Sequence, residues 1–262
     1  MTNYINTEIL CEAYSKLDID IFHDKEKLRA LEEELITFFG QRAKFSFGND
    51  VRIEVEFEEG SLITKLKVIG GAVAVLTTAV SSYGSFREGV TQIASDATML
   101  AQSANYEVIF RTKTAYCNRM DAERRKGIFG RVQVLLDSLD NVQRGFAEDE
   151  IPKNTAALAK FEKSTKALLA WEQSSDKFFR KISDKPTIGC IAAGLLQELE
   201  QLPDEPKWKS EIKNGTFRAA VATNTSAKAA DVAAAAARMS EAVKAVKENM
   251  RNRLDLVAPQ KT

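Results

Sequence analysis

Residues 68–86 read VIGGAVAVLTTAVSSYGSF, a run of 19 residues without a charged side chain. Small side chains recur along this run every four residues, starting at Gly70, and a second glycine follows Gly70 directly. They are Gly70, Gly71, Ala74, Thr78 and Ser82. Residues four apart share one face of a helix. The run therefore predicts a low-charge helix whose small-residue face lets another helix approach closely.

Three interpretations of this run stay open. A hydrocarbon core about 30 Å thick needs roughly 20 apolar residues, so the run is just long enough to span a bilayer. Its threonine, serine and glycine content makes it weakly apolar, which disfavours a permanent anchor. The favoured interpretation is a helix buried among amphipathic helices. The alternative is a helical hairpin over 68–106, made of helices 68–84 and 89–106, that inserts into a bilayer conditionally.

Upstream of the run the hydrophobic pattern has a period of two. Val51, Ile53, Val55 and Phe57 alternate with Arg52, Glu54, Glu56 and Glu58, after a turn signal at 48–50. With Phe45 and Phe47 before the turn, this predicts a β-hairpin near residues 43–59. An isolated hairpin is marginally stable, so its free edge is expected to pack on helices or to pair with a partner's strand. A solvated, edge-protecting role for the glutamates is favoured over cation binding.

The remaining chain has helical periodicity. Apolar residues spaced by three and four predict helices over 5–19, 24–39, 89–126, 131–144, 155–182 and 188–202, and a long last helix within 217–256. Gly40 is expected to end the second of these. The predicted fold class is mainly α. It is a multi-helix bundle with a helical core over 1–145, which contains the hairpin, and a C-terminal helical region over 155–262.

The last helix carries a regular apolar seam. Val232, Ala236, Met239, Val243, Val246 and Met250 step by four and three in alternation. This 3.5-residue repeat is typical of coiled coils. The seam therefore predicts either an interface between chains or the closure of a bundle within one chain, and the sequence favours the two almost equally.

Composition limits the chemistry. The net charge is zero, with 37 basic and 37 acidic residues, one histidine and three cysteines. The sequence therefore has no excess of basic residues of the kind that nucleic-acid binding requires. The N-terminus does not resemble a secretory signal, and the cysteine spacing does not suggest disulfide pairs. We therefore expect a cytoplasmic protein with reduced thiols. Neither His23 nor Cys117 has an evident catalytic partner. No catalytic residue, cofactor or metal ligand is predicted.

The basic cluster consists of Arg119, Arg124, Arg125 and Lys126. It is interpreted as charge at a helix end, with a contact to phosphate or anionic lipid as the second interpretation. We expect a non-enzymatic protein of scaffold or adaptor type that binds a protein partner or a second copy. The expected surfaces are the seam, the hairpin edge and the small-residue face. The alternative function is a pore-forming type of effector that associates with membranes conditionally.

Overall fold

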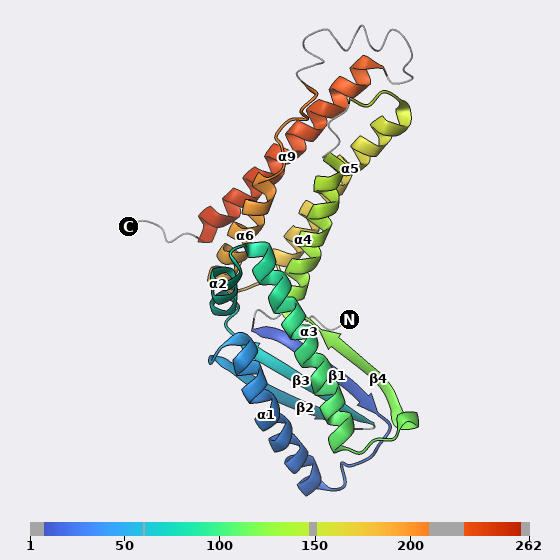
Figure 1. Cartoon of the computed structure of the whole chain (residues 1–262), viewed down its shortest axis with the longest axis vertical. Coiled ribbons are helices and arrows are strands. Elements are labelled where there is room, and N and C mark those ends of the chain that lie inside the picture. Colours follow the sequence, from blue (N-terminus) through green and yellow to red (C-terminus); the bar gives the residue numbers. More distant parts are fainter. Residues whose placement is uncertain (1–7, 60, 147–150, 210–227, 258–262) are drawn as a thin grey trace, which may run out of the picture. The chain divides into compact units, whose positions relative to one another are not determined.

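The computed structural model describes residues 8–59, 61–146, 151–209 and 228–257 (Figure 1). These residues are mainly helical, with seven α-helices and one four-stranded antiparallel sheet. The chain divides into two compact units. The first holds residues up to Gln133 together with 181–187, and the second holds the rest. The division falls inside two helices, between residues 133 and 134 and between residues 187 and 188, whereas the sequence places the boundary between 145 and 155.

The first unit contains the sheet and three complete helices. In chain order these are β1 (Ile9–Leu17), α1 (Lys25–Phe47), β2 (Val51–Glu58), β3 (Leu62–Gly70), α2 (Ala72–Tyr83), α3 (Phe86–Arg111) and β4 (Arg119–Arg125). The strand order is β2-β3-β1-β4, and every neighbouring pair is antiparallel. This connectivity is the split β-α-β pattern of ferredoxin-like folds. Such a pattern serves many functions and assigns none.

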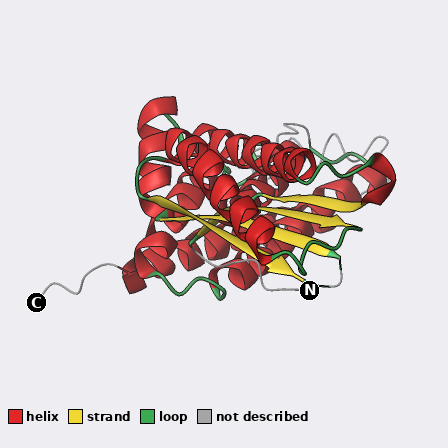
Figure 2. Ribbon diagram, turned by 90° about the horizontal axis from the view of Figure 1, so that it is seen from below, coloured by secondary structure: helices red, strands yellow, loops and turns green. Residues whose placement is uncertain are grey.

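Helices α1 and α3 cover one face of the sheet (Figures 1 and 2). Alternate side chains of the two inner strands point to this face and are buried, among them Ala13, Leu17, Leu62, Leu66 and Val68. α1 contributes Leu35 and Phe39, and α3 contributes Val90 and Ala97, all of them buried. The core of the first unit therefore lies between one helical layer and one sheet face, as in other two-layer domains.

The opposite sheet face carries a row of alternating charge. Strand register aligns Glu54 of β2, Lys67 of β3, Glu12 of β1 and Arg125 of β4. Directly opposed residues of unlike charge stabilise a sheet. Glu12 is 1% exposed, and its Oε1 accepts a hydrogen bond from Arg125 Nη1 at 2.7 Å. Burial raises the pKa of Glu12, and the Arg125 guanidinium acts in the opposite direction.

We expect Arg125→Gln to lower the free energy of unfolding by about 2–3 kcal/mol at neutral pH, because it removes the cation that is hydrogen-bonded to the buried Glu12 carboxylate. A carboxyl whose pKa is raised in the folded state contributes stability below its unfolded pKa of about 4.3, and this contribution is lost as pH rises through the folded pKa. The variant raises that folded pKa further. Its destabilisation should therefore shrink at acid pH.

Urea unfolding at about pH 4 and about pH 7, on either side of the ordinary glutamate pKa, measures this difference. Arg124→Gln is the matched control. Arg124 is exposed and donates to Gln102 Oε1 at 3.0 Å, so its loss should cost below about 1 kcal/mol at both pH values. Equal losses for the two variants at both pH values would contradict the role assigned to Arg125.

The second unit is helical. It contains most of α4 (Gly127–Phe146), α5 (Thr155–Phe179), most of α6 (Lys185–Glu200) and α9 (Ala229–Val257). The two tryptophans, Trp171 and Trp208, are both 1% exposed and both lie in this unit. Trp171 Nε1 donates to the carbonyl oxygen of Leu135 at 2.8 Å, which fixes α5 against α4. Trp208 packs against Phe161 of α5, with ring centroids 5.3 Å apart.

The predicted seam is buried within one chain. Its side chains, Val232, Ala236, Met239, Val243, Val246 and Met250, are each at most 2% exposed. They form the inner face of α9, so the structure places the seam in intramolecular packing. The part of the predicted helix over 217–227 lies outside the described residues.

The structure corrects four of the predicted elements in type or in extent. Residues 9–17 of the expected first helix are β1, and Gly40 does not end α1, which continues to Phe47. Phe45 and Phe47 are therefore helical, and the hairpin is β2-β3 over 51–70 instead of 43–59. The expected helix over 89–126 ends at Arg111, after which β4 forms.

The uncharged run is also divided. Val68, Ile69 and Gly70 belong to β3, and only residues from Ala72 are helical, so the expected helix 68–84 is wrong at its start. α2 packs on α3, and Ala72, Val75, Leu76 and Ala79 are its buried residues. Within the described part of the chain, no helix is both long and apolar enough to cross a membrane.

Candidate protein-binding surface

The outer side of α1 and α3 carries large apolar side chains exposed to solvent. Phe45 of α1 is 94% exposed, and Phe110, Tyr106 and Met99 of α3 are 77%, 62% and 59% exposed. We call these four residues the α1/α3 surface. They account for four of the eight large hydrophobic residues that are exposed in the described part of the chain. Single exposed apolar residues are ordinary, whereas a cluster marks an interaction site.

Helix geometry explains why these residues share a side. Met99, Tyr106 and Phe110 are separated by seven and four residues, which places them on one stripe of α3. The buried residues of α3, such as Ala97, Ala104 and Val108, occupy its other side against the sheet and α1. On α1, Phe45 and the buried Phe47 are two residues apart, and two positions on a helix point to nearly opposite directions. The helical layer thus turns Phe47 inward and Phe45 outward.

Two hollows lie between α1 and α3. One, of about 320 Å³, is lined by Gln41, Arg42, Phe45, Ser46, Asp96, Met99, Leu100 and Ser103. The other, of about 380 Å³, is lined by Glu33, Glu34, Thr37, Phe38, Gln41 and Arg111. Gln41 lines both, so the hollows are neighbours along one groove. Each is large enough for one or two side chains of a partner.

Arginines flank the aromatic rings of this groove. The guanidinium carbon of Arg42 lies 4.0 Å from the centroid of the Phe38 ring, and that of Arg111 lies 5.7 Å from it. Arg111 also forms ion pairs with Glu34 of α1 and Glu107 of α3, which link the two helices. Aromatic residues, methionine and arginine are the residue types enriched at protein interfaces. The groove combines all three.

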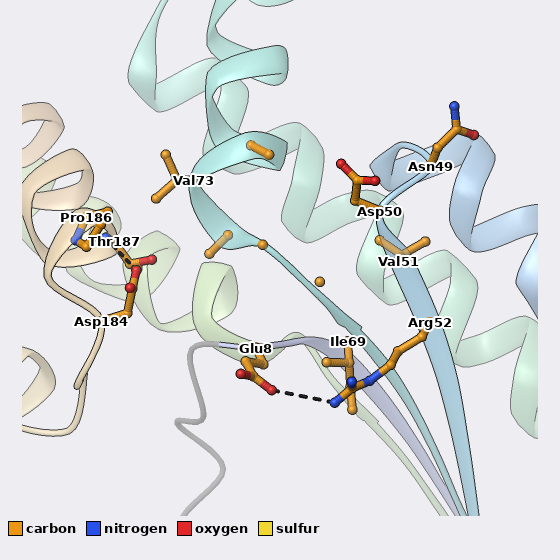
Figure 3. Close-up of a pocket in the computed structure, with 14 residues that line it drawn as sticks. Glu8, Asn49, Asp50, Val51, Arg52, Ile69, Val73, Asp184, Pro186 and Thr187 are labelled. Atoms are coloured by element: carbon orange, nitrogen blue, oxygen red, sulfur yellow. Dashed lines mark hydrogen bonds and ion pairs between the residues drawn. The ribbon is translucent and has the colours of Figure 1, made fainter.

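A separate cleft of about 830 Å³ lies at one end of the sheet, where β3 leads into α2 (Figure 3). Three of its charged side chains, those of Glu8, Arg52 and Asp184, have polar partners within the cleft. Glu8 pairs with Arg52 at 3.7 Å, and Asp184 accepts the backbone N–H of Thr187 at 2.8 Å as the cap of α6. Gly70 lets the strands approach closely here, because a Cβ at this position would lie 2.8 Å from Val51 Cγ1 and would force that side chain to shift. In the described part of the chain, no group of three or more His, Cys, Asp or Glu side chains is placed to hold a metal.

The predicted small-residue face does not form a helix crossing within the described chain. Ala74, Thr78 and Ser82 are exposed, Gly71 is the exposed N-cap of α2, and Gly70 lies in β3. The close approach of α2 and α3 occurs instead at Gly89 of α3, where a Cβ would lie 3.1 Å from the backbone nitrogen of Val80. Conditional membrane insertion of this region stays a prediction.

The predicted basic cluster is dispersed by the strand. Arg124 and Arg125 are neighbours in β4 and therefore point to opposite sheet faces, toward Gln102 and Glu12 respectively. Lys126 Nζ donates to Gln133 Oε1 at 3.1 Å, and Arg119 stands at the far end of β4. The four cations do not converge on one anion site.

The structure also shows the positions of the predicted hairpin-edge residues, of His23 and of Cys117. Val51, Ile53, Val55 and Phe57 are half-buried on β2, an edge strand that α1 contacts. Their partner is β3, and pairing of the outer edge of β2 with another chain stays a prediction. His23 is exposed, and Cys117 is exposed in a short 3-10 turn over Tyr116–Asn118 instead of a helix.

The α1/α3 surface was not found from the sequence, although one signal for it was present. Met99, Tyr106 and Phe110 form a second apolar stripe on a helix whose first stripe already supplies a buried face. No family model matches the chain, and neither a curated protein nor a solved structure matches it significantly.

Proposed function

We propose that this protein acts by binding another polypeptide through the α1/α3 surface, as a non-catalytic scaffold or adaptor. The observation that carries the proposal is the cluster of Phe45, Met99, Tyr106 and Phe110, each more than half exposed, beside two neighbouring hollows. Exposed aromatic residues next to pockets are where most binding energy concentrates at interfaces.

The partner that fits best is an amphipathic helix. Two hollows along one groove between helices suit apolar side chains spaced by one or two turns, as in helix-in-groove recognition. The groove has acidic as well as basic side chains, and Arg111 is ion-paired with Glu34, so it offers an anionic lipid surface no excess of positive charge. We also propose that the second unit is a helical bundle, which the buried seam of α9 supports. A cytoplasmic location is part of the same proposal, and the three cysteines at spacings that suggest no disulfide pairing support it.

A photo-crosslinking experiment in cells that contain the native partner tests this function. A benzophenone amino acid replaces Phe45, and the crosslinked products are resolved by mass. We expect one discrete product with another polypeptide, and we expect Phe110→Ser in the same chain to reduce its yield at least about tenfold, because a lost aromatic anchor costs more than about 1.4 kcal/mol.

The matched control places the same crosslinker at Tyr83, which is 48% exposed on α2 and away from the groove. This position should give no such product. The proposal is wrong if Tyr83 and Phe45 give the same products, or if Phe110→Ser leaves the Phe45 product unchanged. If Phe45 crosslinks only to lipid, the surface binds a membrane and the proposal of a polypeptide partner is wrong.

A further inference from the structure

The second unit has a groove of its own, along α5 and α9. It encloses about 620 Å³ and is lined by Glu162, Thr165, Lys166 and Leu169 of α5 and by Ala235, Arg238, Glu241, Ala242 and Ala245 of α9. Most of its lining is apolar, and Leu169 is 40% exposed. The groove lies on the side of α9 that the buried seam does not use. It is also separate in sequence and unit from the α1/α3 surface.

Two ion pairs and one hydrogen bond between α5 and α9 define their register. Glu162, Glu172 and Asp176 bind Arg238, Asn249 and Arg253, and the two members of each pair are 76 or 77 residues apart. A constant positive offset means that the two helices run parallel and that residues with this offset lie at the same level. Leu169 is therefore level with Ala245, and Lys166 is level with the residues next to Glu241.

This register makes the groove complementary to itself. At one level Glu162 on one rim forms an ion pair with Arg238 on the other. Close to the next level Lys166 lines the α5 rim and Glu241 lines the α9 rim. Consider a second copy related to the first by a rotation of 180° about an axis that runs along the groove, parallel to both helices. In this arrangement α5 of one copy faces α9 of the other, and each residue keeps its height along the axis. Each charge then meets its opposite on a second copy, and Leu169 meets the small side chain of Ala245. Self-complementarity of this kind is what a two-fold interface requires.

We propose that the α5/α9 groove binds the same groove of a second copy, so that the protein forms a parallel two-fold dimer through the second unit. α5 of each chain lies over α9 of the other. The interface contains two Leu169–Ala245 contacts between chains and two Lys166–Glu241 ion pairs. This dimer goes beyond the partner binding proposed for the α1/α3 surface and does not depend on it.

A charge-exchange experiment tests the dimer. Sedimentation equilibrium over a range of concentrations gives the dimer dissociation constant of the full chain and of the variants Lys166→Glu and Glu241→Lys. Each variant alone places two pairs of like charges across the interface, and we expect its dissociation constant to rise about tenfold or more. An equal mixture of the two variants restores both opposite-charge pairs, so the mixture should form a heterodimer close to wild-type affinity.

Three further results decide the proposal. Ala245→Arg, at an exposed position, should abolish the dimer because it fills the space of the partner's Leu169. Lys163→Glu changes an exposed residue of α5 outside the groove and should leave the dissociation constant within about twofold of wild type. A wild-type chain that stays monomeric, single variants that dimerise like wild type, or a mixture that does not recover would overturn the proposal. Thermal unfolding of each variant confirms that the fold is retained.

Discussion

Replacement of Gly127 by alanine should be the most damaging single change in the first unit, with a loss of at least about 3 kcal/mol in the free energy of unfolding. Gly127 joins β4 to α4 and has a φ of +59°, in the left-handed region that favours glycine. A Cβ there would lie 2.3 Å from the carbonyl oxygen of Ile9 and 2.4 Å from that of Leu10. Both oxygens belong to the backbone at the start of β1, where Ile9 pairs with Ile69 of β3. A backbone atom cannot swing aside as the end of a flexible side chain can, so the clash would have to shift the start of this strand.

The matched control is Gly40→Ala. Gly40 lies inside α1, and a Cβ there would meet no atom within 4 Å. Alanine is favoured over glycine in a helix by about 1 kcal/mol, so this variant should be more stable than wild type by up to that amount. Urea unfolding followed by far-UV circular dichroism measures both changes. If Gly127→Ala unfolds within about 1 kcal/mol of wild type, the close approach of this turn to β1 is wrong.

In the second unit the largest effect is expected at Trp171. Trp171→Ala should lower the free energy of unfolding by about 3–5 kcal/mol, because it removes a fully buried ring and leaves a cavity among α4 and α5. Trp171→Phe retains most of the ring but loses the N–H that donates to the Leu135 carbonyl oxygen. The Leu135 carbonyl oxygen lies inside α4 and keeps its helical hydrogen bond, so the loss of this second hydrogen bond should cost about 0.5–1.5 kcal/mol. The two variants separate the packing contribution from the hydrogen bond.

The fluorescence of Trp208 reports unfolding in both variants, since it is then the single remaining tryptophan and is buried against Phe161. Lys163→Ala, at an exposed position of the same helix, is the control and should change stability by less than about 0.5 kcal/mol. A Trp171→Phe variant as stable as wild type would show that the hydrogen bond to Leu135 contributes nothing.

The strands were predicted only where one face of the strand meets solvent. β2 alternates apolar and charged residues because α1 covers one face and the other face is open, so its period of two is visible in the sequence. β3 shows the same alternation over residues 65–68, where Lys65 and Lys67 alternate with Leu66 and Val68, and the uncharged run begins at the end of this pattern. The correct hairpin was therefore present in the sequence.

The other two strands gave no such signal. β1 lies between β3 and β4, with one face buried and the other, which carries Tyr14 and Lys16, half-buried. Its apolar residues at 10, 13, 14 and 17 imitate helical spacing. β4 is five-sevenths charged and becomes a strand only because it pairs with β1, which precedes it by about 100 residues. Strand propensity depends on such context more than helix propensity does.

The sequence by itself determined that the protein is mainly helical, that β2 is a strand, and that the face of α9 from Val232 to Met250 is apolar. These features follow from local periodicity, which reports the face of an element that is removed from water. Tertiary structure alone decided which surface covers each apolar face. It buried the α9 seam within the chain and left Phe45, Met99, Tyr106 and Phe110 exposed, because a pattern gives the direction of a side chain and only packing gives its neighbour.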